Sequence, residues 1–327
     1  MKKYLLFFLI PCLFACNSAK SVIDDIALTV HVQRLDHDLS KLSADSLPIV
    51  RERYGAFFEI YNTSIIAIGH STNPLYLELV QNFLHHDVVK EAYQGVAEAF
   101  PNEEKLDEQF TNAFKYLTYH FPEMLIPSVV AYVSGFNEAI VLTDSVIGIG
   151  LDRFLGGDYP LYSQLGFPRF LQQTMTPERV AIMSVHNWLA SDYQSDINGD
   201  NTLLARMIHE GKLLYALRQC FPDCTEEMNM GYTQEQYSWC EANEQQMWET
   251  LIEKKMLYLS NQLTIQKLTS DSPFTSEFSS AAPGKVCCWI GYRIVSEYMK
   301  KNPGLTLPEL MEQGDAQMIL KESRYNP

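Results

Sequence analysis

The sequence predicts an α+β fold that is predominantly helical and includes one small antiparallel sheet. Apolar residues recur at three- and four-residue spacing over most of the chain, as they do in amphipathic helices. Short β-branched segments follow one another between residues 128 and 151, with hairpin-length loops between them. The chain has no internal repeats and no low-complexity tracts. We therefore expect a small sheet within a mainly helical protein.

The N-terminus has the features of an exported, membrane-tethered chain. Lys2 and Lys3 precede an apolar run over 4–10 that is too short to span a bilayer, as in a secretory signal. The tetrapeptide Leu-Phe-Ala-Cys that ends at Cys16 resembles the lipobox of bacterial lipoproteins, in which this cysteine carries the lipid. The alternative is an ordinary cleaved signal in which Cys16 is incidental. The expected division is a signal peptide over 1–15, a lipidated tether over 16–25 and a single folded domain over 26–327.

The composition is that of a folded, acidic protein. Hydrophobic residues make up 46% of the chain and aromatic residues 12%, enough for a sizeable core. Loss of Lys2 and Lys3 with the signal leaves 23 basic against 40 acidic residues and takes the net charge from −15 to −17. Because phosphate backbones and anionic head groups repel such a surface, we expect no nucleic-acid partner.

The first part of the expected domain is one strand followed by helices. Residues 26–35 alternate between apolar and polar closely enough to predict a strand. The spacing is helical from about 45 to 119, with breaks expected at Asn73-Pro74 and Pro101-Asn102. The apolar faces of these helices are expected to include Val50, Tyr54, Phe57 and Phe58, then Tyr76, Leu79, Val80 and Phe83, then Phe110, Phe114 and Leu117.

The middle of the chain predicts an antiparallel meander, and the remainder predicts helices. The three strands are expected over 128–134, 139–143 and 146–151. Thr202 follows a polar turn and is the expected N-cap of a helix. The helices are expected over 177–190, 202–219, 233–258 and 287–301.

The cysteines indicate little about chemistry. With Cys12 removed and Cys16 acylated, an odd number remains, which does not suit a complete disulfide framework even after export. Their spacing does not match a structural zinc site. We expect buried free thiols, with one disulfide at most around 220–240. The remaining cysteines are Cys220, Cys224, Cys240, Cys287 and Cys288.

One expected helix carries part of a metal-binding motif, His209-Glu210-Gly211-Lys212-Leu213. In zincin metalloproteases, two histidines four residues apart bind zinc from one helix face, and the intervening glutamate is the general base. Here the second position is Leu213, whose side chain has no electron pair to donate. A two-histidine zinc site on this helix is therefore excluded, and we expect no catalytic residue, no metal ligand and no cofactor.

The other histidines and acids have ordinary explanations. His209 most simply forms a hydrogen bond within its helix, although a metal-ligand role and an unrelated binding role stay open as alternatives. Ser184, His186 and Asp192 are the residue types of a catalytic triad, but no serine lies in a Gly-x-Ser-x-Gly elbow.

Several tracts resemble the GldB family of gliding-motility lipoproteins of Bacteroidetes. The signature is the segment that surrounds His209 and Glu210, and further matches follow in the same order through most of the mature chain. The matching tracts are 149–156, 204–215, 231–240, 243–248, 283–285, 289–299 and 319–327.

The resemblance implies a cell-envelope lipoprotein associated with gliding machinery. It also implies kinship with predicted zinc proteases, and thus a zincin-like fold whose active-site helix is degenerate. In those relatives a glutamate about thirty residues downstream is a plausible third ligand, and Glu244 is the position that aligns with it. Because Leu213 replaces the second histidine, the protease chemistry does not transfer.

Three functional hypotheses follow. The leading one is a non-catalytic scaffold or interaction module, anchored by its lipid, facing the periplasm from either membrane, with envelope proteins of the motility or secretion machinery as partners. The first alternative is a zinc metallopeptidase that uses His209, Glu244 and a further ligand, with Glu210 as base. The second is a periplasmic protein that binds a peptide or a glycan.

Overall fold

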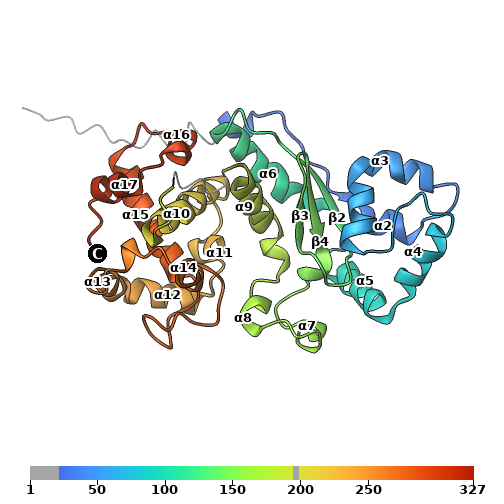
Figure 1. The fold of residues 1–327 in the computed structure, drawn as a ribbon. Helices are drawn as coiled ribbons and strands as arrows, with labels where there is room; N and C mark the ends of the chain where they lie inside the picture. The colour runs from blue at the N-terminus through green and yellow to red at the C-terminus, as the bar shows by residue number, and fades with distance from the viewer. Residues whose placement is uncertain (1–21, 194–198) are drawn as a thin grey trace, which may run out of the picture.

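The computed structural model describes residues 22–193 and 199–327 (Figure 1). The N-terminal helices lie at one end of an elongated molecule, the sheet lies in the middle, and the C-terminal helices lie at the other end. Cys16 and the expected signal peptide lie outside the described residues. Among the residues that are described, no helix is long and apolar enough to span a membrane.

The elements up to the end of the sheet are β1 (Gln33–Arg34), α2 (Leu35–Ser40), α3 (Leu47–Ile60), the π-helix η1 (Tyr61–Ile65), α4 (Tyr76–His85), α5 (Asp87–Ala99), α6 (Glu104–His120), β2 (Ser128–Tyr132), β3 (Ile140–Leu142) and β4 (Val146–Gly150). The elements that follow are η2 (Leu151–Arg153), α7 (Pro160–Gln164), α8 (Arg169–Gln172), η3 (Pro177–Arg179), α9 (Val180–Asp192), α10 (Leu203–Cys220), α11 (Glu226–Met230), α12 (Gln234–Ala242), α13 (Glu244–Glu253), η4 (Met256–Tyr258), α14 (Gln262–Thr269), α15 (Val286–Lys301), α16 (Leu307–Glu312) and α17 (Ala316–Ser323).

The expected α+β class is confirmed, but the sheet is mixed and is not an antiparallel meander. Its strand order is β1-β2-β4-β3. Strands β3 and β4 form the expected antiparallel hairpin, whereas β2 pairs with β4 in parallel, from Ser128 opposite Val146 to Tyr132 opposite Gly150. Strand β4 therefore lies between the two strands that were expected to be neighbours.

A buried carboxylate explains why β2 does not continue into a hairpin. Asp152 accepts hydrogen bonds from the backbone N–H groups of Ser134 and Phe136, just beyond the end of β2. Burial raises the pKa of Asp152 to about 6, although these hydrogen bonds act in the opposite direction. Gly135 and Phe136 both have positive φ, at 72° and 68°, so the chain turns around this carboxylate and away from β2.

The strand expected over 26–35 is correct only at Gln33–Arg34. Upstream of Gln33, the backbone N–H groups that could pair with a neighbouring strand donate hydrogen bonds to side chains of α6 instead. Val30 N donates to Thr111 Oγ1 at 2.9 Å, and Val32 N donates to Asp107 Oδ1 at 2.8 Å. This segment is therefore hydrogen-bonded to α6 and not to the sheet.

Both faces of the sheet are buried, each against a different set of helices. Alternate residues of β2 point to opposite faces, as strand geometry requires. Val129 and Ala131 belong to the large core that includes residues of α6, α9, α10 and α15. Val130 and Tyr132 belong to a smaller core that includes residues of α2, α3 and α4.

The helices agree closely with the expected ones. The breaks at Asn73-Pro74 and Pro101-Asn102 and the helices at α9, α10 and α15 are confirmed. Thr202 is the N-cap of α10, and its side chain accepts from Ala205 N at 3.2 Å. The single helix expected over 233–258 is wrong, because Asn243 ends α12 and its Nδ2 donates to the Trp239 carbonyl at 2.7 Å.

Helices α10 and α15 approach each other through two glycines. A Cβ atom added to Gly291 would lie 1.8 Å from the carbonyl oxygen of Met207, and one added to Gly211 would lie 2.4 Å from the backbone of Gly291. Real Cβ atoms do not come this close to a backbone, so larger residues would force the helices apart. The crossing therefore depends on glycine at both positions.

We predict that Gly291→Ala lowers the free energy of unfolding by about 3 kcal/mol, because the added methyl overpacks a backbone contact that has no room to relax. Urea denaturation measures the change. Gly304→Ala is the matched control, since a Cβ added there meets nothing within 4 Å. Equal stability of the two variants would contradict the close crossing.

Candidate functional site

The second position of the degenerate motif is part of the core. Leu213 is only 2% exposed and belongs to the large hydrophobic cluster. Its neighbour Lys212 is also buried, and Nζ donates to the carbonyls of Met311 and Gln313 at 3.1 and 2.7 Å. Burial lowers the pKa of Lys212 to about 8. Leu213 thus packs α10 into the core, and Lys212 links α10 to the C-terminal end of α16.

The other candidate ligands do not come together. Burial, and then the charges of Arg206 and Lys212, lower the pKa of His209 to about 4. Glu244 is engaged elsewhere: its Oε1 accepts from Arg293 Nε at 3.0 Å and from the Tyr325 hydroxyl at 2.7 Å. Within the described residues, no group of three or more histidine, cysteine, aspartate and glutamate side chains is arranged to hold a metal ion.

A groove runs along a different face of α10. Three pockets of about 390, 230 and 260 Å³ adjoin in a row, the second sharing lining residues with the first and with the third, and together we call them the α10 groove. Thr202, Arg206, Glu210 and Leu214 line it from α10, and their four-residue spacing places them on one helix face. The opposite walls include Thr269 at the end of α14, Ser270 and Asp271 just after it, Lys285, Trp289 of α15, His186 of α9, and Asn229 and Met230 of α11.

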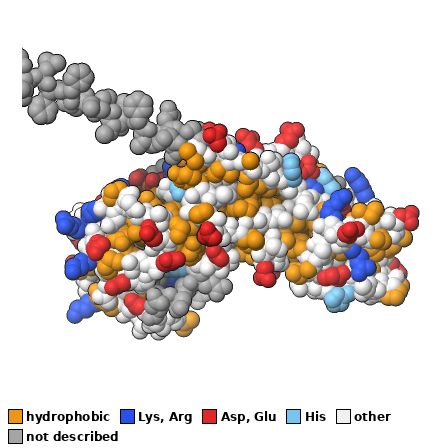
Figure 2. All heavy atoms as spheres, turned by 90° about the horizontal axis from the view of Figure 1, so that it is seen from above, with side chains coloured by type: hydrophobic (Ala, Val, Ile, Leu, Met, Phe, Trp, Pro, Cys, Tyr) orange, Lys and Arg blue, Asp and Glu red, His pale blue; other side chains and the backbone are white. Residues whose placement is uncertain are grey.

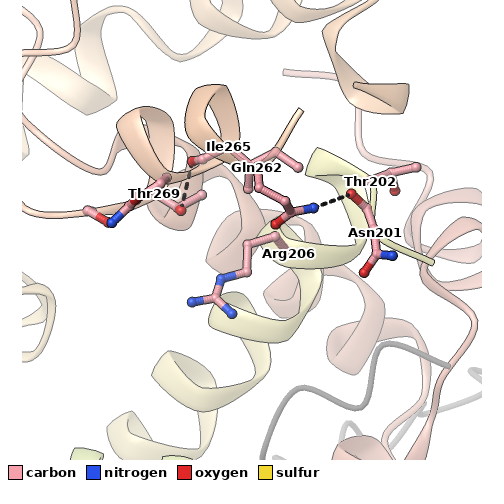
Figure 3. Close-up of a pocket in the computed structure, with 8 residues that line it drawn as sticks. Asn201, Thr202, Arg206, Gln262, Ile265 and Thr269 are labelled. Atoms are coloured by element: carbon pink, nitrogen blue, oxygen red, sulfur yellow. Dashed lines mark hydrogen bonds between the residues drawn. The ribbon is translucent and has the colours of Figure 1, made fainter. Parts of the chain in front are cut away.

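The shallow end of the groove lies between α10 and α14 and is lined mainly by polar groups. Figure 3 shows Gln262 reaching from α14 toward the Asn201 carbonyl, to which its Nε2 donates at 3.3 Å. Thr269 donates to the Ile265 carbonyl at 2.9 Å, and Arg206 extends into the space between the two helices.

Two ion pairs lie among the residues that line the groove. Arg206 Nε lies 3.1 Å from Glu210 Oε1, and Lys285 Nζ lies 2.7 Å from Asp271 Oδ1. Burial raises the pKa of Glu210, and the nearby cations Arg206 and Lys285 oppose that shift. Glu210 is thus the one residue of the motif that faces the groove, held between cations.

His186 lies in the deeper part of the groove, where the second and third pockets meet. Burial is the main reason that its pKa falls to about 4, and the charges of Lys285, Arg179 and His209 add to the shift, while Asp271 opposes it. This shift favours the neutral form of the His186 imidazole at pH 7. Neither Ser184 nor Asp192 lines these pockets with it.

Sequence reasoning missed most of the groove. Arg179, Asp271 and Lys285 come from three separate segments and belong to no common motif. A signal was nevertheless present, because four tracts that resemble the GldB family contribute to this one region. They supply Glu210, Tyr232, Lys285 and Trp289.

All five cysteines in the described residues are free thiols, so the disulfide allowed for at 220–240 is wrong. Four of them are buried, and Cys224 is partly exposed. Burial raises the pKa of Cys220 and of Cys240 to about 12, which makes both poor nucleophiles.

The structure is thus a mainly helical α+β fold with a groove along α10. Residues 16–327 match the model of a protein family described as gliding motility protein GldB. The chain therefore belongs to the GldB family. No curated protein and no solved structure matches it.

We predict that Leu213→Glu lowers the free energy of unfolding by roughly 3 kcal/mol, because a carboxylate replaces a core side chain and has no partner there. Thermal or urea denaturation measures the loss. Leu263→Glu, at a helical position that is 72% exposed, is the control and should stay within about 0.5 kcal/mol of wild type. Wild-type stability of Leu213→Glu would mean that this position opens to solvent.

We predict that His186 makes the protein less stable in mild acid. Its pKa is about 4 in the folded chain against 6.5 in the unfolded chain, so the unfolded state binds more protons as pH falls below 6.5. This group alone should remove about 2 kcal/mol between pH 7.5 and pH 5. Urea denaturation at both pH values should show a smaller loss for His186→Gln and the wild-type loss for the exposed His86→Gln. Parallel pH profiles for all three proteins would contradict the assignment.

Proposed function

We propose that this protein is a lipid-anchored envelope component of the gliding-motility machinery and acts as a non-catalytic scaffold or interaction module. Membership of the GldB family supports the association with motility. The lipobox that ends in Cys16 supports the anchor. The observation that carries the non-catalytic part is the burial of Leu213 in the core at the position where a zincin has its second histidine.

The charge distribution favours a lipid anchor over electrostatic docking. On the face in Figure 2, acidic side chains are spread over the surface, whereas basic ones lie mainly towards the two ends. The net charge of −15 would repel anionic head groups. Acyl chains on Cys16 supply membrane affinity that does not depend on surface charge.

The metallopeptidase alternative requires a different arrangement of side chains. It requires His209 and Glu244 in one ligand set, but Glu244 Oε1 is bound by Arg293 and Tyr325. Metal analysis of protein purified without chelators tests it. About one zinc per chain, together with a peptidase activity that Glu210→Gln abolishes, would overturn the non-catalytic proposal.

The α10 groove favours a binding role within the scaffold hypothesis. Cross-linking in live cells followed by identification of the linked proteins tests the proposal directly. We expect defined envelope proteins of the motility machinery to be linked reproducibly. A chain that links to no envelope protein would not be a scaffold.

We predict that Cys16→Ala moves the protein from the membrane fraction to the soluble fraction or leaves its precursor unprocessed, because no acyl chain can be attached. Membrane fractionation and detergent phase partitioning measure this. Cys12→Ala, in the same segment, is the control and should fractionate as wild type. Unchanged fractionation of Cys16→Ala would exclude lipidation at this residue.

A further inference from the structure

We propose that the α10 groove binds an extended peptide and that Arg179 holds the peptide's terminal carboxylate at the deep end. This inference rests on the proposed function, because it takes the domain as a binding module, and it deepens that function by naming the class of ligand. Three independent features carry it: a partly buried cation without a counterion, two buried polar atoms without partners, and the length of the groove.

Arg179 is a cation that lacks a counterion. It lines the third pocket, and its Nη1 donates to the carbonyl of Met228. Its Nε is buried and has no hydrogen-bond partner, and Arg179 forms no ion pair with any of the described residues. Asp271 acts on it only through space, and burial lowers the pKa of Arg179 to about 10. A partly buried guanidinium is costly until an anion pairs with it, and a carboxylate is its best geometric match.

The absence of a side chain at Gly231 leaves room for the guanidinium of Arg179. Gly231 follows α11 with φ of 73°, in the left-handed region that glycine tolerates best. A Cβ atom at Gly231 would lie 2.8 Å from Arg179 Nη2. Glycine thus allows the guanidinium to lie directly against the backbone at the end of the groove.

Two more polar atoms in the groove lack partners within the described chain. Trp289 Nε1 is a donor on a side chain that is completely buried, and Asn229 Oδ1 is an acceptor on one that is 6% exposed. Both residues line the pockets next to Arg179. Buried polar groups are nearly always paired, and a peptide group offers both the acceptor and the donor that these two atoms need.

The length and charge of the groove suit a short extended segment. Thr202 and Leu214 are twelve residues apart on α10, or about 18 Å along the helix axis. That distance equals about five residues of extended peptide. In an acidic chain, the groove is lined by three cationic and two anionic side chains, which favours an anionic end group. These are Arg179, Arg206 and Lys285 against Glu210 and Asp271.

Two pools of degenerate pentapeptides test the proposal with the full-length mature lipoprotein in detergent. Both pools carry an N-terminal fluorophore and contain no aspartate or glutamate; one ends in a free carboxylate and the other in an amide. Fluorescence anisotropy measures binding. We expect the free-carboxylate pool to bind at least tenfold more tightly than the amide pool.

Two variants and a control locate the site. Arg179→Gln removes a partly buried charge that has no counterion, so the fold should persist while the preference for the free carboxylate falls below twofold. Ser270→Trp changes an exposed residue shared by the first two pockets and should weaken binding of both pools at least tenfold. Ser280→Trp, also at an exposed position and outside these pockets, should bind as wild type.

The inference is overturned if neither pool binds, if the pools bind equally, or if Arg179→Gln keeps the carboxylate preference. Cross-linking in cells separates this failure from failure of the proposed function. A wild-type chain that links to motility proteins while neither pool binds would remove the peptide site and leave the scaffold. A wild-type chain that links to no envelope protein would remove the scaffold itself.

Discussion

The contact between Gly211 and Gly291 is the constraint on which the C-terminal half depends. Because neither residue has a side chain, α10 and α15 touch backbone to backbone. That proximity directs Leu213 into the core, while Glu210 and Leu214 of one helix and Trp289 of the other line the same pocket. Both helices of this close pair therefore contribute to the lining of the groove.

How far the fold could be predicted depends on how local each determinant is. Helix spacing, proline breaks and the Thr202 cap are encoded within a few residues, and the structure agrees with them. The parallel pairing of β2 depends on Asp152, which lies eighteen residues beyond Ser134. The loss of the strand at Val30 depends on Thr111 of α6. Nothing in either local pattern reveals such distant partners.

The features of the candidate site also differ in how local their determinants are in the sequence. That Leu213 cannot act as the second histidine of a zincin motif was evident from the sequence, because the spacing of ligands on one helix is a local property. The groove was not evident, since Arg179, Asp271 and Lys285 each look like an ordinary charged residue until the fold brings them together. The family-like tracts that include Glu210, Tyr232, Lys285 and Trp289 were the one hint that distant segments share a site.

The contact between the N-terminal segment and α6 fixes the point from which a tether to the N-terminus would leave the domain. Ile23 is buried, and the Asp24 carbonyl accepts from Lys115 Nζ of α6 at 3.1 Å. Ile23 lies seven residues after Cys16, and a fully extended chain of that length spans at most about 25 Å. If Cys16 carries the proposed lipid, the point of attachment at Ile23 therefore stays within this distance of the membrane surface.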